Sequence, residues 1–77
     1  MDVQVTVDRE ADAAYIFLTK DRVVVSRKQV FVPHDNGFDV IIDFDQNGRM
    51  IGIEIIGAEV GLDSEFLADA DDITNRE

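Results

Sequence analysis

The residues best placed by type and spacing to do chemistry lie between Asp43 and Glu54. They follow the calcium-loop pattern D-x-[DN]-x-[DN]-G-x5-E, in which oxygen ligands recur at fixed spacing around a cation. Such a loop lies between two helices and needs a polar or water-bridging group at its ninth position. Here the ninth position is Ile51 and both flanks are β-branched. The sequence therefore argues against calcium, and a weak cation site on Asp43, Asp45 and Glu54 stays only as an alternative.

A β-hairpin explains the same segment better, because Asn47-Gly48 is the strongest short-range hairpin signal. A two-residue turn there makes one face of the hairpin wholly apolar, and a one-residue slip would mix the two faces. The expected apolar pairs are Phe44 with Ile51, Ile42 with Ile53 and Val40 with Ile55. The other face is expected to pair Asp45 with Met50, Asp43 with Gly52 and Ile41 with Glu54.

No other residue forms a recognisable reactive group. His34 is the only histidine and lies in a loop of turn-forming residues, without the partner that a general base needs. Neither Ser26 nor Ser64 lies in a nucleophile motif. Asp43 and Asp45 are expected on an exposed face, where nothing would raise a carboxyl pKa for acid catalysis. We therefore predict no catalytic residue, no cofactor and no metal.

Composition limits the class of protein. The chain has 77 residues, which make one small domain, and it has no cysteine. Seventeen acidic residues oppose seven basic ones, for a net charge of −10, which disfavours nucleic acid and anionic membranes as partners. Solubility alone explains the charge, and a basic protein partner is the alternative. The absence of a signal-peptide pattern and of a long apolar run predicts a cytoplasmic location.

Alternating apolar residues predict strands, and the fold class is expected to be mainly β (α+β). We expect a single antiparallel meander of about five strands with one short C-terminal helix. Asp63 is expected to cap that helix, with Leu62 packing on Leu67. The predicted strands are Val3–Val7, Ala13–Leu18, an interrupted strand over Val23–Val32, Phe38–Phe44 and Met50–Ile56. The expected organisation is a sheet domain over 1–62, a helix over 63–70 and a flexible acidic tail over 71–77.

The two faces of this sheet differ in what they are expected to contact. The core is predicted to comprise Val3, Val5, Val7, Ala14, Ile16, Leu18, Val40, Ile42, Phe44, Ile51, Ile53 and Ile55. One short helix cannot cover both faces, so apolar residues left on the second face are expected to form a homodimer interface. These residues are Tyr15, Phe17, Ile41, Met50 and Ile56. The alternative is that the protein's own loops cover them.

Two segments of the chain resemble the small bacterial domain-of-unknown-function family 2283. They are Asp8-x-Glu10-Ala11-Asp12-Ala13-Ala14-Tyr15-Ile16 and Asp43-Phe44-Asp45…Gly48-Arg49-x-x-Gly52-Ile53-Glu54-Ile55. The resemblance covers about Val3 to Ala58 and implies a compact β-sheet domain, with no catalytic residues to carry over. Arg9 stands where the family commonly has proline, and the acidic extension after Leu62 is longer than usual.

Two functions remain after these considerations. The first is a non-enzymatic interaction module whose acidic surface binds a basic protein, such as the antitoxin-like half of a protein pair. Small size, the charge of −10 and the acidic tail favour it. The second is a small hydrolase or metal-binding enzyme that uses Asp43, Asp45 and Glu54, with His34. Because so short a chain has little room for a water-excluding pocket, we favour the first.

Overall fold

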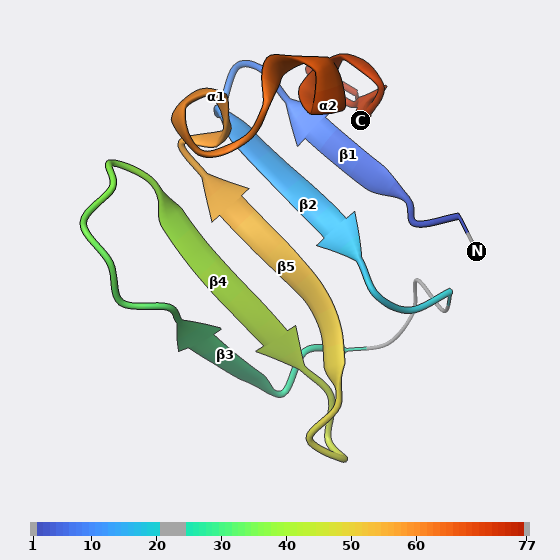
Figure 1. The fold of residues 1–77 in the computed structure, drawn as a ribbon. Helices are drawn as coiled ribbons and strands as arrows, with labels where there is room; N and C mark the ends of the chain where they lie inside the picture. Colours follow the sequence, from blue (N-terminus) through green and yellow to red (C-terminus); the bar gives the residue numbers. More distant parts are fainter. Residues whose placement is uncertain (1, 21–24, 77) are drawn as a thin grey trace.

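Period-two alternation of apolar residues produces a single sheet in the computed structural model, which describes residues 2–20 and 25–76 (Figure 1). Within these residues the sheet has six strands, and two short helices lie over one end of it. The strands are β1 (Val5–Asp8), β2 (Ala13–Phe17), β3 (Lys28–Phe31), β4 (Asp39–Phe44), β5 (Met50–Ile56) and β6 (Asp71–Asp72). The helices are α1 (Ala58–Gly61) and α2 (Ser64–Ala68). Neither is long and apolar enough to cross a membrane.

The sheet is mixed, with the strand order β3-β4-β5-β2-β1-β6. The predicted mainly β fold with one sheet is confirmed, but the antiparallel five-stranded meander is wrong in two respects. First, β2 pairs with β5 rather than with β3. In the strand order, β5 and β4 lie between β2 and β3, which follow each other in the sequence. Second, β6 adds a strand parallel to β1. Part of the interrupted third strand lies outside the described residues, and its described part contains only β3.

Strands β4 and β5 flank the Asp43–Glu54 segment as a hairpin, whereas a calcium loop would lie between two helices. The hairpin turn is one residue longer than expected: the Asp45 N–H donates to the Arg49 carbonyl oxygen at 2.9 Å, and Gly48 has a φ of +77°. As a result, Met50 lies opposite Phe44, where Ile51 was expected, and not opposite Asp45. A register shift at the next position corrects the offset, as a β-bulge does. Beyond it the strands pair as predicted, with Asp43 opposite Gly52, Ile41 opposite Glu54, Ile42 opposite Ile53 and Val40 opposite Ile55.

The core lies where the helices cover the sheet. Its buried residues are Val7, Ala14, Ile55, Ala58 and Leu67. Asp63 caps α2 as predicted, since its Oδ2 accepts the Phe66 N–H at 3.1 Å, and Leu62 packs against the same cluster as Leu67. The predicted core is wrong at Val3 and Leu18, which are 52% and 42% exposed, because the helices end before reaching them.

Backbone contacts far apart in sequence fix the ends of the sheet. Helix α1 lies within residues 1–62, for which only strands were predicted. Asp12 holds the start of this helix in place. Its carbonyl oxygen accepts the Gly57 N–H at 2.8 Å, and its Oδ1 accepts the Glu59 N–H at 3.0 Å. The expected flexible tail contributes β6 to the sheet, and the Ile73 N–H donates to the Val7 carbonyl oxygen at 2.8 Å. The Asp12 carboxylate and two backbone carbonyl oxygens thus accept the N–H groups that fix α1 and the tail.

Candidate functional site

Asp43 is a buried carboxylate at the centre of a polar cluster. Its side chain is 5% exposed, so the expectation of an exposed Asp43 is wrong. Tyr15 Oη donates to its Oδ2 at 2.7 Å, while Gln29 Nε2 and Ser26 Oγ donate to its Oδ1 at 2.8 and 3.3 Å. These donors come from β2, β3 and the segment before β3. Three donors satisfy the carboxylate in place of water, as a buried acid requires.

Gly52 allows Tyr15 to reach Asp43 across the intervening strand. Strand β5 lies between β2 and β4, and Gly52 is paired with Asp43 on one side and with Phe17 on the other. A Cβ atom on Gly52 would overlap the Tyr15 hydroxyl and ring. The missing side chain therefore leaves the channel through which the phenol crosses the strand. Tyr15 itself lies opposite Glu54.

This environment keeps the Tyr15 phenol protonated. Burial raises its pKa above the usual 10.0, and the hydrogen bond to Asp43 and the negative charges of Asp43 and Glu54 raise it further. A phenol that resists ionisation is a hydrogen-bond donor rather than a base or nucleophile. The cluster is therefore built to hold the sheet together, with the Asp43 oxygens already occupied by donors.

The remaining members of the expected acidic site have other contacts. Asp45 Oδ1 accepts the N–H groups of Asn47 and Arg49 at 2.9 and 3.0 Å, which stabilises the turn. Within residues 2–20 and 25–76, no three His, Cys, Asp or Glu side chains form a group that could hold a metal ion. The structure thus does not assemble Asp43, Asp45 and Glu54 into one cation site. His34 is exposed, and its Nδ1 accepts the Asn36 N–H at 3.3 Å.

The five residues of the expected dimer interface do not share one surface. Tyr15 and Phe17 are half-buried with ring centroids 4.7 Å apart, and Ile41 is only 4% exposed within the single chain. Ile56 lies on their face and is 40% exposed. Met50 is opposite Phe44 and therefore shares the other face of the sheet, because cross-strand partners point to the same side. An interface on the Tyr15 face stays a prediction.

The helix-side face is only partly covered, and its apolar residues form three rows across the strands. The row under the helices contains Val40, Ile55, Ala14 and Val7. The middle row contains Val30, Ile42, Ile53, Ile16 and Val5, which are half-buried apart from Val30 at 36% exposed. The row nearest the β4–β5 turn contains Phe44, Met50, Leu18 and Val3. We call the middle row and the row nearest the turn the open half of this face.

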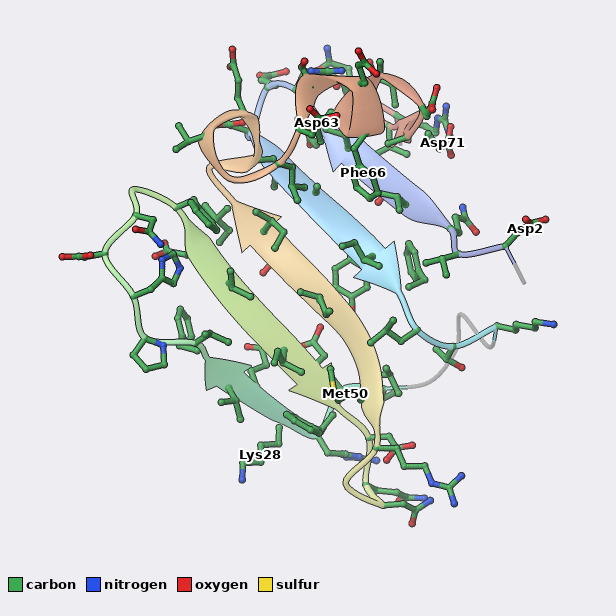
Figure 2. The ribbon with its side chains drawn as sticks, in the orientation of Figure 1. Asp2, Lys28, Met50, Asp63, Phe66 and Asp71 are labelled. Atoms are coloured by element: carbon green, nitrogen blue, oxygen red, sulfur yellow. The ribbon has the colours of Figure 1, made fainter. Side chains whose placement is uncertain are left out.

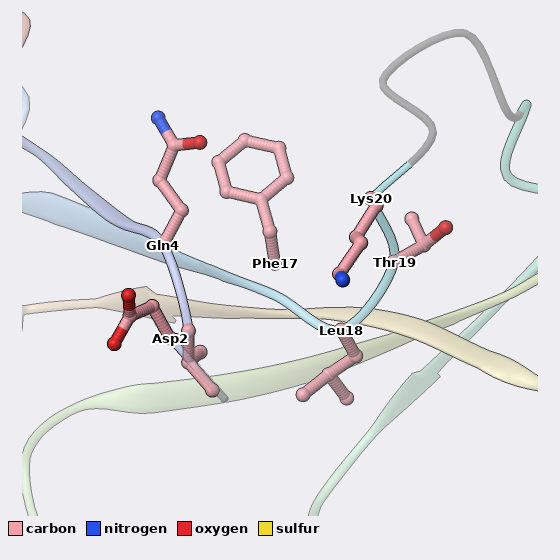
Figure 3. Close-up of a pocket in the computed structure, with 7 residues that line it drawn as sticks. Asp2, Gln4, Phe17, Leu18, Thr19 and Lys20 are labelled. Carbon is pink, nitrogen blue, oxygen red and sulfur yellow. The ribbon is translucent and has the colours of Figure 1, made fainter.

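A hollow of about 440 Å³ lies at one corner of the open half (Figure 3). Val3 and Leu18 contribute to its lining from the open half, and Phe17 contributes from β2. Figure 3 shows the Phe17 ring between Gln4 and Lys20, which also line the hollow. The hollow extends the apolar surface of the open half around the end of β1 and β2.

Exposed carboxylates gather at the opposite end of the strands, around the helices. They are Glu59, Asp63, Glu65, Asp69, Asp71 and Asp72, which we call the acidic end. Figure 2 shows Asp63 and Asp71 beside α2, and Met50 at the far end of β5. Hydrogen bonds from Thr74 lower the pKa of Asp72, which favours its charged form. In the described part of the chain the one ion pair is Arg76 with Asp71, at 3.1 Å, so the acidic end keeps a large excess of negative charge.

Sequence patterns did not reveal Gln29 and Ser26 as partners of Asp43, because they precede or lie on an edge strand whose neighbour was unknown. A glycine directly opposite an aspartate was the available signal. The expected register correctly paired Asp43 with Gly52, but it did not predict that the Tyr15 side chain fills the space above Gly52.

Comparison with known proteins supports the family resemblance and adds no activity. The model of the family described as protein of unknown function (DUF2283) matches residues 4–58. No curated protein and no solved structure is significantly similar to the chain. The matched region contains both segments of the resemblance, and with them Tyr15 and Asp43 of the buried cluster and Gly52 beside it. The chain therefore belongs to the DUF2283 family of proteins of unknown function.

Proposed function

We propose that this protein is a small non-enzymatic interaction module that binds a basic protein through its acidic end. The observation that carries the proposal is the group of six exposed carboxylates on α1, α2, β6 and the residues between them. From Glu54 to Asn75 the sequence contains no lysine or arginine. Such a surface attracts a basic partner, increases the rate of encounter and disfavours nucleic acid.

The groups that could otherwise support catalysis have structural roles. Asp43 accepts three hydrogen bonds, Asp45 stabilises a turn and Tyr15 is held protonated. These contacts favour an interaction module over the alternative of a small hydrolase. An acidic protein that neutralises a basic one, as the antitoxin-like half of a pair would, is one form of this function.

Affinity purification from the native cells, followed by binding measurements with the purified partner, tests the proposal. We expect a basic protein that binds with defined stoichiometry and more weakly as ionic strength rises. The triple variant Glu59→Gln, Glu65→Gln, Asp69→Asn should weaken binding at least tenfold. The control Asp2→Asn, Asp35→Asn, Asp39→Asn removes the same number of exposed carboxylates elsewhere and should change it less than threefold.

The control separates local recognition from net charge. If both triple variants weaken binding equally, the acidic end has no particular role and the proposal is wrong. It is also wrong if no specific basic partner is recovered, or if the partner's affinity is unaffected by salt.

A further inference from the structure

The open half of the helix-side face is an apolar surface with almost no charge. Among the described strand residues of the open half, Lys28, opposite Phe44, is the only one with a charged side chain. Among the described strand residues, no acidic side chain lies in the open half, and Asp72, opposite Val7, lies in the row under the helices. Two copies with a net charge of −10 each can therefore approach through the open half without placing strand carboxylates against each other.

The exposed area of the chain is larger than its mass requires. It exposes 5605 Å², whereas a monomeric protein of 8.6 kDa exposes about 4,700 Å² on the usual scaling. The excess of about 900 Å² is close to the ~800 Å² that each partner contributes to a standard interface. The open half contributes exposed apolar surface to the total, since Val3, Leu18, Val30 and Met50 are between 36% and 52% exposed. The open half thus has the apolar chemistry of one side of a dimer.

The position of the helices selects how two copies could meet. Facing sheets pack about 10 Å apart, and one helix is about 10–12 Å across. If the helix ends of two copies overlapped, two layers of helix would hold the sheets too far apart for contact. If the second copy is turned end for end, only one layer of helix lies between the sheets at each end, and the helices of each copy lie over the row nearest the turn of the other.

Charge favours the same end-for-end arrangement. Three exposed cations, Arg27, Lys28 and Arg49, lie at the turn end of the sheet. The acidic end of the partner would lie next to them. Six carboxylates face only three cations, so the acidic end keeps negative charge with which to bind the basic partner of the proposed function. Phe66, 42% exposed on α2, would gain apolar contacts on the partner's open half (Figure 2).

We propose that the open half binds the open half of a second copy, turned end for end about a two-fold axis, so that α1 and α2 of each copy cover the row nearest the turn of the other. The interface is self-complementary, as a two-fold dimer requires. This dimer is distinct from one built on Tyr15, Phe17 and Ile56, which lie on the opposite face.

Two substitutions on β5 test the proposal as a matched pair. Met50 and Ile56 are 43% and 40% exposed but lie on opposite faces and near opposite ends of the strand. Sedimentation equilibrium of the wild type should give twice the 8.6 kDa of one chain. Met50→Asp should raise the dimer dissociation constant at least tenfold, and Ile56→Asp should leave it within threefold. Circular dichroism should show that both variants are folded, and Val3→Asp serves as a second disrupting variant.

A wild-type mass of 8.6 kDa at high micromolar concentration would overturn the proposal. So would a folded Ile56→Asp variant that dissociates, whether or not Met50→Asp also does, because the interface would then include the Tyr15 face. The two proposals are tested separately. If the acidic-end variant no longer binds the basic partner but still forms the dimer, the dimer proposal does not depend on the proposed function. If Met50→Asp no longer forms the dimer but still binds the basic partner, the proposed function does not depend on the dimer.

Discussion

Replacing Tyr15 with phenylalanine removes one hydroxyl from the buried cluster and should destabilise the fold measurably. The lost bond is 2.7 Å long and its acceptor, Asp43, is 5% exposed. A hydrogen bond to a charged group contributes about 1.5–3 kcal/mol. Asp43 would keep the donors Gln29 and Ser26, so we expect a loss of about 1.5–3 kcal/mol rather than the larger cost of an unpaired buried charge. A chain of this length has a total stability of about 4–12 kcal/mol.

The same hydroxyl should make stability depend on alkaline pH. Because the native pKa of Tyr15 is raised above 10.0, the unfolded state loses its phenolic proton first as pH rises. The stabilising contribution is complete below about pH 10 and decreases above it, by about 1.4 kcal/mol per pH unit, until the native phenol also ionises. Tyr15→Phe should lack this decrease. Tyr15 is the only tyrosine, so tyrosinate absorbance in the native protein reports on this group alone.

Urea unfolding followed by far-ultraviolet circular dichroism measures both effects, with all proteins at the same concentration because self-association also stabilises. The double variant Tyr15→Phe, Asp43→Asn completes a cycle whose coupling energy should exceed about 1 kcal/mol. If Tyr15→Phe remains within about 0.5 kcal/mol of the wild type, or if native Tyr15 titrates near its usual pKa, the reasoning about the cluster is wrong.

Three further predictions concern the rest of the fold. Gly52→Ala should cost about 1–3 kcal/mol and return the pKa of Tyr15 towards its usual value, because the new methyl group would displace the phenol; an unchanged tyrosine titration would contradict this. Asp63→Ala should cost about 0.5–2 kcal/mol in urea unfolding, because the Phe66 N–H loses its acceptor, whereas no loss would show that the cap does not stabilise α2. Calorimetry with calcium should detect no tight site, and a dissociation constant of about 10⁻⁷–10⁻⁵ M would restore the calcium-loop interpretation.

Local patterns predicted the hairpin well because its register is set by one apolar face. Ile42 opposite Ile53 and Val40 opposite Ile55 follow from alternation alone. The turn was missed by one residue, since Asn47-Gly48 can also close a three-residue loop. A β-bulge then restored the expected pairs beyond it but moved Met50 to the helix-side face. The alternation of apolar residues does not predict a bulge that offsets a longer turn.

Long-range contacts account for the larger errors. Strand β6 has two residues and depends on pairing with β1, and α1 depends on the acceptors of Asp12. Neither has a local pattern strong enough to predict it. The burial of Asp43 required knowing that β2 pairs with β5, which places Tyr15 next to Gly52. The strand order, rather than the properties of individual strands, could not be derived from the sequence.

The end-for-end dimer is tested most directly by isotope-filtered nuclear Overhauser spectroscopy on a mixture of labelled and unlabelled chains. This experiment detects only contacts between copies. The arrangement predicts contacts from Phe66 on α2 to Met50 and Phe44 near the turn of the partner. Intermolecular contacts confined to Phe17 and Ile56, or none in a sample concentrated to the millimolar range, would contradict it.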